Sequence, residues 1–295
     1  MNSRLIVGVG SIALGVGIAA SAVLGPLVLR VIDFRTSEHL ENQFVGGEAV
    51  SLAIVAPMAM TAGALYLRDH RLAPALALGP ALYAAYTYTT AILGQEYARY
   101  PGNVERFFPL YAGLIAGGVA LAAVAWTQLG ATERPTLSGG LQRSLAGIFL
   151  GIGGFFALAW AQQIRLVVAG NPPAEYQEGP KLFWVIKLLD FGFMIPLLIA
   201  TGVGLVRHRP AAVRAAFGLA TFATCLVASV AGMAIAMEVT GDPSAQPAML
   251  VVLFPAVAGL TAATVRLFRA YLQPTVSEDA GRSESLPATH LAIPA

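Results

Sequence analysis

Long apolar stretches alternate with short polar segments along the whole chain. Each stretch is close to the roughly 20 residues that an α-helix needs to cross the ~30 Å hydrocarbon core of a bilayer. None shows the two-residue alternation that is typical of strands in a membrane barrel. The pattern therefore predicts an all-α polytopic transmembrane bundle of about eight spans, at residues 5–29, 49–67, 73–93, 107–128, 144–169, 183–206, 213–237 and 248–270.

Composition supports a membrane protein and excludes several function classes. Of the 295 residues, 57% are apolar and 12% are charged, whereas a soluble domain usually carries about 25% charged residues. The basic residues are scattered instead of forming a basic stripe, so no nucleic-acid partner is expected. With one cysteine, Cys225, no intramolecular disulfide is possible. Motifs for metals, nucleotides and nucleophilic catalysis are absent, so we predict no metal, no cofactor and no nameable catalytic residue.

Arginine and lysine residues are biased toward one side of the predicted spans. By the positive-inside rule, this bias predicts a multi-pass plasma-membrane (inner-membrane) protein with both termini in the cytoplasm. Most acidic residues fall on the predicted outer side. The polar, Pro/Ser-rich segment 273–295 is predicted to be a disordered cytoplasmic tail.

The two halves of the chain resemble each other at an offset of about 139 residues. Pro57 begins PMAMTAGALYLRDHR, and Pro196 begins PLLIATGVGLVRHR. The match predicts one four-span unit over 1–130 and a second over 131–272. Units of four spans keep their orientation, so a pseudo-twofold axis along the membrane normal would relate them, as in transporters with parallel repeats. The alternative is chance similarity between helices rich in Ala, Gly and Leu.

The two matching prolines fall near the middle of their predicted spans. Each removes a helical hydrogen bond and leaves a carbonyl, at Ala53 or Gly192, short of its donor. We predict a hinge or an ion-coordinating carbonyl near the midplane, and an ordinary proline kink is the alternative. Glycines four residues apart predict close helix packing within the chain, at Gly113 with Gly117 and at Gly147 with Gly151, and contact between copies of the chain is the alternative.

Polar residues form a stripe on one face of the third predicted span. Their spacing of three and four residues places them on one side of a helix. They are predicted either to line a hydrated pathway or to form hydrogen bonds between helices. The residues are Tyr83, Tyr86, Thr87 and Thr90.

Carboxylates lie near the predicted outer ends of four spans, at Glu48, Glu96, Asp190 and Glu238. Ionisable groups in membrane segments are costly and usually face a bundle interior or a wet cavity. We therefore predict an acidic vestibule that binds a substrate or an ion. For the three glutamates, the alternative is solvated charge at a helix end.

Asp190 lies deepest of the four acids. Lys187, three residues earlier on the same helix face, is its nearest predicted partner. Arg165 and Arg106 are further candidate partners for a substrate or ion site. A structural pair of Asp190 with Lys187 is the alternative to a functional one.

Several short motifs lie between Gly47 and Tyr111: Gly47 and Glu48 with Leu52 and Pro57, the tyrosines at 83, 86 and 88, and Phe108 with Tyr111. The segment from Asp190 to Pro196, with the Arg-rich turn that follows, belongs to the same set. In these motifs the chain resembles a family of uncharacterised prokaryotic multi-spanning membrane proteins. The resemblance implies a membrane fold and no particular activity.

Three functions fit these observations. The first is a transporter of a small solute or an ion, coupled to protons, with Asp190 as the ion site. The second is a non-catalytic subunit or lipid-binding scaffold of a membrane complex, which requires a protein partner or a second copy of the chain. The third is a membrane-embedded enzyme that acts on a lipid or a quinone. All three share the lipid bilayer as a partner, and only the first requires a small solute or cation.

Overall fold

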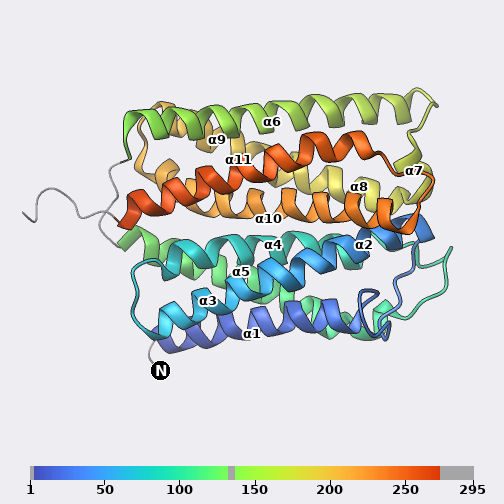
Figure 1. Ribbon diagram of the computed structural model, residues 1–295, viewed down its shortest axis with the longest axis horizontal. Helices are drawn as coiled ribbons and strands as arrows, with labels where there is room; N and C mark the ends of the chain where they lie inside the picture. Colours follow the sequence, from blue (N-terminus) through green and yellow to red (C-terminus); the bar gives the residue numbers. More distant parts are fainter. Residues whose placement is uncertain (1–2, 132–136, 273–295) are drawn as a thin grey trace, which may run out of the picture.

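The computed structural model describes residues 3–131 and 137–272, and this part of the chain is helical and contains no strand (Figure 1). The all-α polytopic bundle is therefore confirmed. The predicted tail, 273–295, lies outside the described residues. The helices are α1 (Ser3–Leu24), α2 (Glu38–Val50), α3 (Ala56–Leu67), α4 (Ala73–Leu93), α5 (Phe108–Ala131), α6 (Gly139–Val168), α7 (Ala174–Glu178), α8 (Pro180–Leu189), α9 (Ile195–Val206), α10 (Pro210–Thr240) and α11 (Pro247–Leu272). Two π-helical turns, η1 (Ser51–Val55) and η3 (Asp190–Met194), and a 3-10 turn, η2 (Val104–Phe107), complete the elements.

Seven helices of the described part are long and apolar enough to cross a membrane. They correspond to seven of the predicted spans. The eighth, 73–93, forms α4, which has a sufficient length of 21 residues but carries Tyr and Thr in its second half. α4 packs between α5, α3 and α10, and each of its Tyr and Thr residues is buried or half-buried against other helices.

The second span begins earlier than the hydropathy pattern predicts. Residues 38–47, expected in a connecting loop, continue the helix because Ser37 caps it and the Ser37 Oγ accepts a hydrogen bond from the Leu40 N–H. The polar first turns of α2 lie against α10, which explains how a hydrophilic segment stays helical at the end of the bundle.

Helices α4 and α10 join the two halves of the chain at the centre of the bundle (Figure 1). Within the first half α1 packs on α3, and within the second α6 packs on α9. The contacts across the halves are reciprocal, since α2 lies on α10 and α8 lies on α4. The duplication itself stays a prediction, and this arrangement is what a pseudo-twofold axis between α4 and α10 requires.

Each of the two matching prolines follows a π-helical turn. The Ala56 N–H donates to the Ser51 carbonyl, and the Ile195 N–H donates to the Asp190 carbonyl, so both bonds span five residues instead of four. A π-bulge widens the helix locally, which accommodates a proline ring without breaking the chain direction. Pro57 and Pro196 both point to the exposed side of the bundle. Their role as hinges stays a prediction.

The predicted packing role of the glycine pairs within the chain is wrong. A Cβ at Gly113, Gly147 or Gly151 would meet nothing within 4 Å, and at Gly117 only a Leu14 methyl at 3.9 Å. These glycines therefore lie on the outer surface of α5 and α6 and do not bring helices of this chain together.

Gly46 of α2 and Gly232 of α10 form a close helix crossing between the halves. A Cβ on Gly46 would overlap the Gly232 carbonyl, and a Cβ on Gly232 would lie 2.6 Å from the Gly46 carbonyl oxygen. Within the first half, Gly63 of α3 makes a similar approach, because its Cβ would lie 2.5 Å from the Gly8 carbonyl oxygen of α1. Backbone-to-backbone contact of this kind needs glycine at the crossing.

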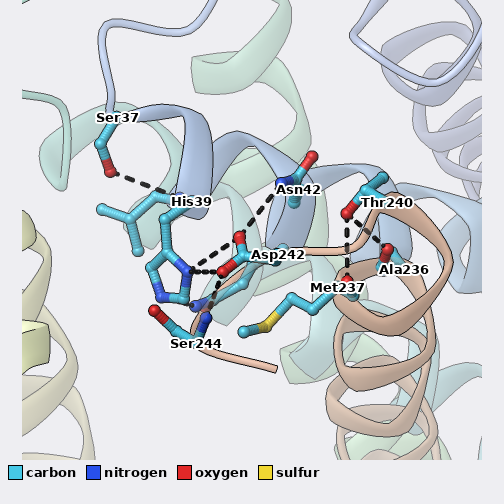
Figure 2. A network of polar contacts seen from close by, with 10 residues as sticks. Ser37, His39, Asn42, Ala236, Met237, Thr240, Asp242 and Ser244 are labelled. Carbon is cyan, nitrogen blue, oxygen red and sulfur yellow. Dashed lines mark hydrogen bonds and ion pairs between the residues drawn. The ribbon is translucent and has the colours of Figure 1, made fainter. Parts of the chain in front are cut away.

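Carboxylates also join the halves at the end of the bundle where α2 and α8 begin, which we call the distal end. Asp242, just after α10, accepts hydrogen bonds from Asn42 Nδ2 at 3.1 Å and from the Ser244 N–H at 2.9 Å (Figure 2). His39 Nδ1 lies 3.1 Å from both of its carboxylate oxygens. In the reciprocal position Glu96, just after α4, accepts a hydrogen bond from the Lys181 N–H at the start of α8, at 2.8 Å. Each central helix thus ends in an acid that holds the first turn of a helix from the other half.

We expect Asp242→Asn to weaken the distal end in a pH-dependent way. Burial opposes ionisation of Asp242, but the hydrogen bonds from Ser244, Asn42 and His39 outweigh it and lower the pKa of this carboxyl below its ordinary value. A depressed pKa means that the stabilisation is present at neutral pH and is lost as the pH falls through the folded-state pKa, below about 4. The substitution should cost roughly 1–3 kcal/mol at pH 7.

The measurement is chemical or thermal unfolding in detergent from pH 7 to pH 3. Glu38→Gln is the matched control, since Glu38 is an exposed carboxylate in the turn of α2 that contains His39. This substitution should change stability little. The difference between the wild type and Asp242→Asn should shrink below about pH 4. A difference that stays constant over this range would contradict the assignment.

Candidate functional site

Asp190 lies at the junction of η3 with helices from both halves. Its side chain accepts two hydrogen bonds from neutral donors, the Tyr86 hydroxyl of α4 at 2.9 Å and the Trp160 Nε1–H of α6 at 2.6 Å. The residue is only 8% exposed. The prediction that Asp190 faces an interior is consistent with this position, and one member of the polar stripe, Tyr86, contacts it directly.

Lys187 lies beside Asp190 and does not form a direct ion pair with it within the described residues. Its ammonium nitrogen is 3.5 Å from the Trp160 ring centroid and 4.3 Å from the Phe183 ring centroid. Lys187 is 6% exposed, so two aromatic faces replace water around the charge. The two charged groups remain electrostatic neighbours. Their spacing of three residues does not bring the charged atoms into an ion pair, because the ammonium lies on the Trp160 ring while the carboxylate is held by Tyr86 and the Trp160 N–H.

The indole of Trp160 connects these two groups. Its N–H donates to the Asp190 carboxylate, while its ring faces the Lys187 ammonium. Sequence reasoning missed Trp160 and Phe183, because an aromatic residue in an apolar run gives no signal of its own. The only available hint was the position of each aromatic residue relative to the predicted outer end of its span.

The other cations predicted near Asp190 do not reach it. Arg165 is exposed at the end of α6, and its Nε donates to Gln162 at 3.1 Å. Arg106 is exposed in η2, on the first half of the chain. A role for either residue in binding stays a prediction.

The remaining predicted acids have separate surroundings. Glu48 is buried in α2, where one carboxylate oxygen accepts a hydrogen bond from the Ser21 hydroxyl at 3.1 Å. Glu96 caps the start of α8 and lies 3.6 Å from the Lys181 ammonium. Glu238 is half-buried near the end of α10, and its Oε1 has no hydrogen-bond partner among the described residues. A vestibule shared by all four acids stays a prediction.

The other residues of the polar stripe mostly bond within the protein. The Tyr83 hydroxyl lies 2.9 Å from the Ser51 Oγ and donates to the Ser229 Oγ at 3.1 Å. The Thr90 hydroxyl donates to the Thr87 carbonyl within the same helix. These bonds match the packing interpretation of the stripe, and a role in a pathway stays a prediction.

The arrangement around Asp190 is suited to a positive charge. The faces of Trp160 and Phe183 lie against the Lys187 ammonium, and the Asp190 carboxylate lies nearby on the Trp160 N–H; aromatic faces with a neighbouring carboxylate suit an organic cation. A scan of protein-family models, a search of curated proteins and a search of solved structures found no match to this chain.

Proposed function

We propose that this integral membrane protein is a transporter of a small, positively charged solute, and that the Asp190 site binds this solute. The observation that carries the proposal is the pair of buried opposite charges, Asp190 and Lys187, each held by neutral or aromatic groups and not by each other. Burying charges inside a membrane protein is expensive, so such residues commonly belong to a substrate or ion pathway.

The identity of the solute follows from the groups around Lys187. An ammonium group already occupies the space between Trp160 and Phe183, next to a carboxylate. A substrate amine of similar size would make the same contacts once the lysine side chain moved away. Lys187 would then act as an internal substitute that keeps the site neutral when no solute is bound.

The location of the site at the contact between the halves supports transport. Tyr86 belongs to the first half, whereas Asp190 and Trp160 belong to the second, so a movement of one half against the other would change the hydrogen bonds of the carboxylate. Rigid movement of one repeat against another around a central site is the usual form of alternating access. Orientation with both termini in the cytoplasm of the plasma membrane belongs to the same proposal.

The test is the electrical current of purified protein in liposomes during addition of ethylammonium, tetramethylammonium, choline or Na⁺. We expect a saturable current for at least one of the organic cations. Asp190→Asn should abolish that current, and the double variant Asp190→Asn/Lys187→Met should abolish it as well. Glu38→Gln, which removes an exposed carboxylate at the same end of the bundle, should keep it.

The proposal fails if none of these cations gives a current, or if folded, monodisperse Asp190→Asn protein transports like the wild type. Native mass spectrometry of protein extracted gently from its own membrane separates the alternatives. A partner protein at fixed stoichiometry would indicate a complex subunit, and a bound lipid or quinone that the protein converts would indicate an enzyme.

A further inference from the structure

Glu48 lies in a buried polar cluster that is separate from the Asp190 site. The side chains around it come from three other helices: Ser21 of α1, Tyr83 and Tyr88 of α4, and Tyr111 of α5. Glu48 is 5% exposed, and the three tyrosines are fully buried. The cluster is therefore an interior feature of the first half and not part of an open vestibule.

Several oxygen atoms of this cluster lack hydrogen-bond partners. Among the described residues, Glu48 Oε2 and the hydroxyls of Tyr88 and Tyr111 are buried without one. Both phenols are electrostatic neighbours of Glu48, both have the Ser21 hydroxyl within interaction range, and their rings lie 5.7 Å apart. Buried polar atoms nearly always have a partner, so one carboxylate oxygen and two neighbouring phenol oxygens without a hydrogen bond point to a bound ligand or water.

The charge of Glu48 also has no counterpart. Ser21 is the one group that bonds to it, and no Lys, Arg or His of the described residues lies within ion-pair distance. An isolated carboxylate in a low-dielectric interior is very costly and requires a positive companion or a bound proton.

In the second half, the buried acid Asp190 has a cation from the same half, Lys187, beside it. Lys187 is separated from Glu48 by the same interval that separates Pro196 from Pro57, and both residues lie three positions before a π-turn. Asp190 thus has an internal cation, Lys187, beside it. In the first half, the position that corresponds to Lys187 is Glu48, which is itself an acid. The first half needs a cation from outside.

We propose that Glu48, Ser21, Tyr88 and Tyr111 form a binding site for one monovalent cation, Na⁺ or H⁺. The donor atoms are all oxygen, which suits a hard cation, and the cluster contains one carboxylate, which balances one positive charge. A divalent ion would leave a buried net charge. The site is independent of the proposed transport function, because binding at Glu48 stabilises the fold whether or not any solute is moved.

The first measurement is the melting temperature of purified protein in detergent, in NaCl, KCl or choline chloride of equal ionic strength. If Na⁺ is the cation, Na⁺ raises the melting temperature saturably and choline does not, because a ligand that binds the folded state stabilises it. Glu48→Gln, which keeps the size of the side chain and the bond to Ser21, loses this rise. Tyr111→Phe weakens the apparent Na⁺ affinity about tenfold or more, as expected for the loss of one bond to a charged group.

The second measurement distinguishes a proton. If H⁺ is the cation, salts have no specific effect, and the infrared spectrum of the wild type at neutral pH contains a carboxylic-acid carbonyl band that Glu48→Gln lacks. Glu38→Gln is the control and should behave like the wild type in both experiments. Should Glu48→Gln fail to fold, Tyr88→Phe and Tyr111→Phe carry the comparison, because loss of a phenol should weaken the Na⁺ response in the first experiment and shift the carboxylic-acid band in the second. The proposal is overturned if the wild type shows neither a Na⁺-specific rise nor that band.

Discussion

Gly46→Leu is expected to prevent the two halves of the bundle from packing together. The new side chain would enter the α2–α10 crossing, where its Cβ alone overlaps the Gly232 backbone. Overpacking in a core commonly costs about 1–3 kcal/mol when flexible side chains can give way. Here the obstacle is backbone, so the loss should reach roughly 3 kcal/mol or more. The measurement is the yield of monodisperse protein on size-exclusion chromatography, together with its melting temperature.

Gly151→Leu is the matched control for this prediction. Gly151 belongs to a glycine pair that the sequence alone marks as a packing motif, yet a Cβ there would meet nothing within 4 Å. We expect a change within about 0.5 kcal/mol, typical of a surface substitution. Equal damage from both variants would mean that the α6 glycines contact another molecule, and equal tolerance would contradict the α2–α10 crossing.

The second large effect concerns the charges of Asp190 and Lys187. Asp190→Asn leaves a buried ammonium without its neighbouring carboxylate, and Lys187→Met leaves the carboxylate without its neighbouring cation. Removal of one member of a buried pair typically costs about 3–5 kcal/mol. We expect the double variant Asp190→Asn/Lys187→Met to be more stable than the sum of the single variants predicts, with a coupling of about 1 kcal/mol or more. Unfolding in detergent measures all four proteins of the cycle.

An exposed ion pair provides the control cycle. Arg4 and Asp69 lie 2.5 Å apart with side chains 57% and 65% exposed. Because solvent screens such a pair, Arg4→Gln and Asp69→Asn should show a coupling within about 0–1 kcal/mol. A coupling of similar size in the two cycles would indicate that the Asp190 and Lys187 charges do not sense each other.

The two buried polar clusters differ in net charge and in the halves of the chain that form them. The Asp190 cluster is neutral as built, because Lys187 lies beside it, and it spans both halves of the chain. The Glu48 cluster is formed mainly by the first half and carries one uncompensated acid. The Asp190 site, which Lys187 already occupies, and the Glu48 site, which requires a cation, are therefore two distinct sites. The test of one does not depend on the test of the other.

The sequence alone determined the all-α membrane fold and the approximate positions of its spans. Apolar runs of bilayer length leave no other way to satisfy the backbone, so hydropathy was sufficient. It also indicated which residues carry unusual chemistry, since a charge at Asp190 or Glu48 within an apolar run is conspicuous wherever the helix packs. The start of α2 at Glu38 was not visible, because the contact with α10 that supports this polar segment is made by residues far away in the chain.

Only the tertiary structure decided which groups meet. The sequence spacing favoured a direct pair of Lys187 with Asp190, but Trp160 and Tyr86 from other helices take the carboxylate, and the Trp160 ring takes the ammonium. The glycine pairs of α5 and α6 had the stronger sequence signal, yet the backbone contact between α2 and α10 uses single glycines, Gly46 and Gly232. Contacts between helices depend on which face each helix turns toward its neighbours. The packing of the whole bundle sets these rotations, so no local sequence pattern encodes them.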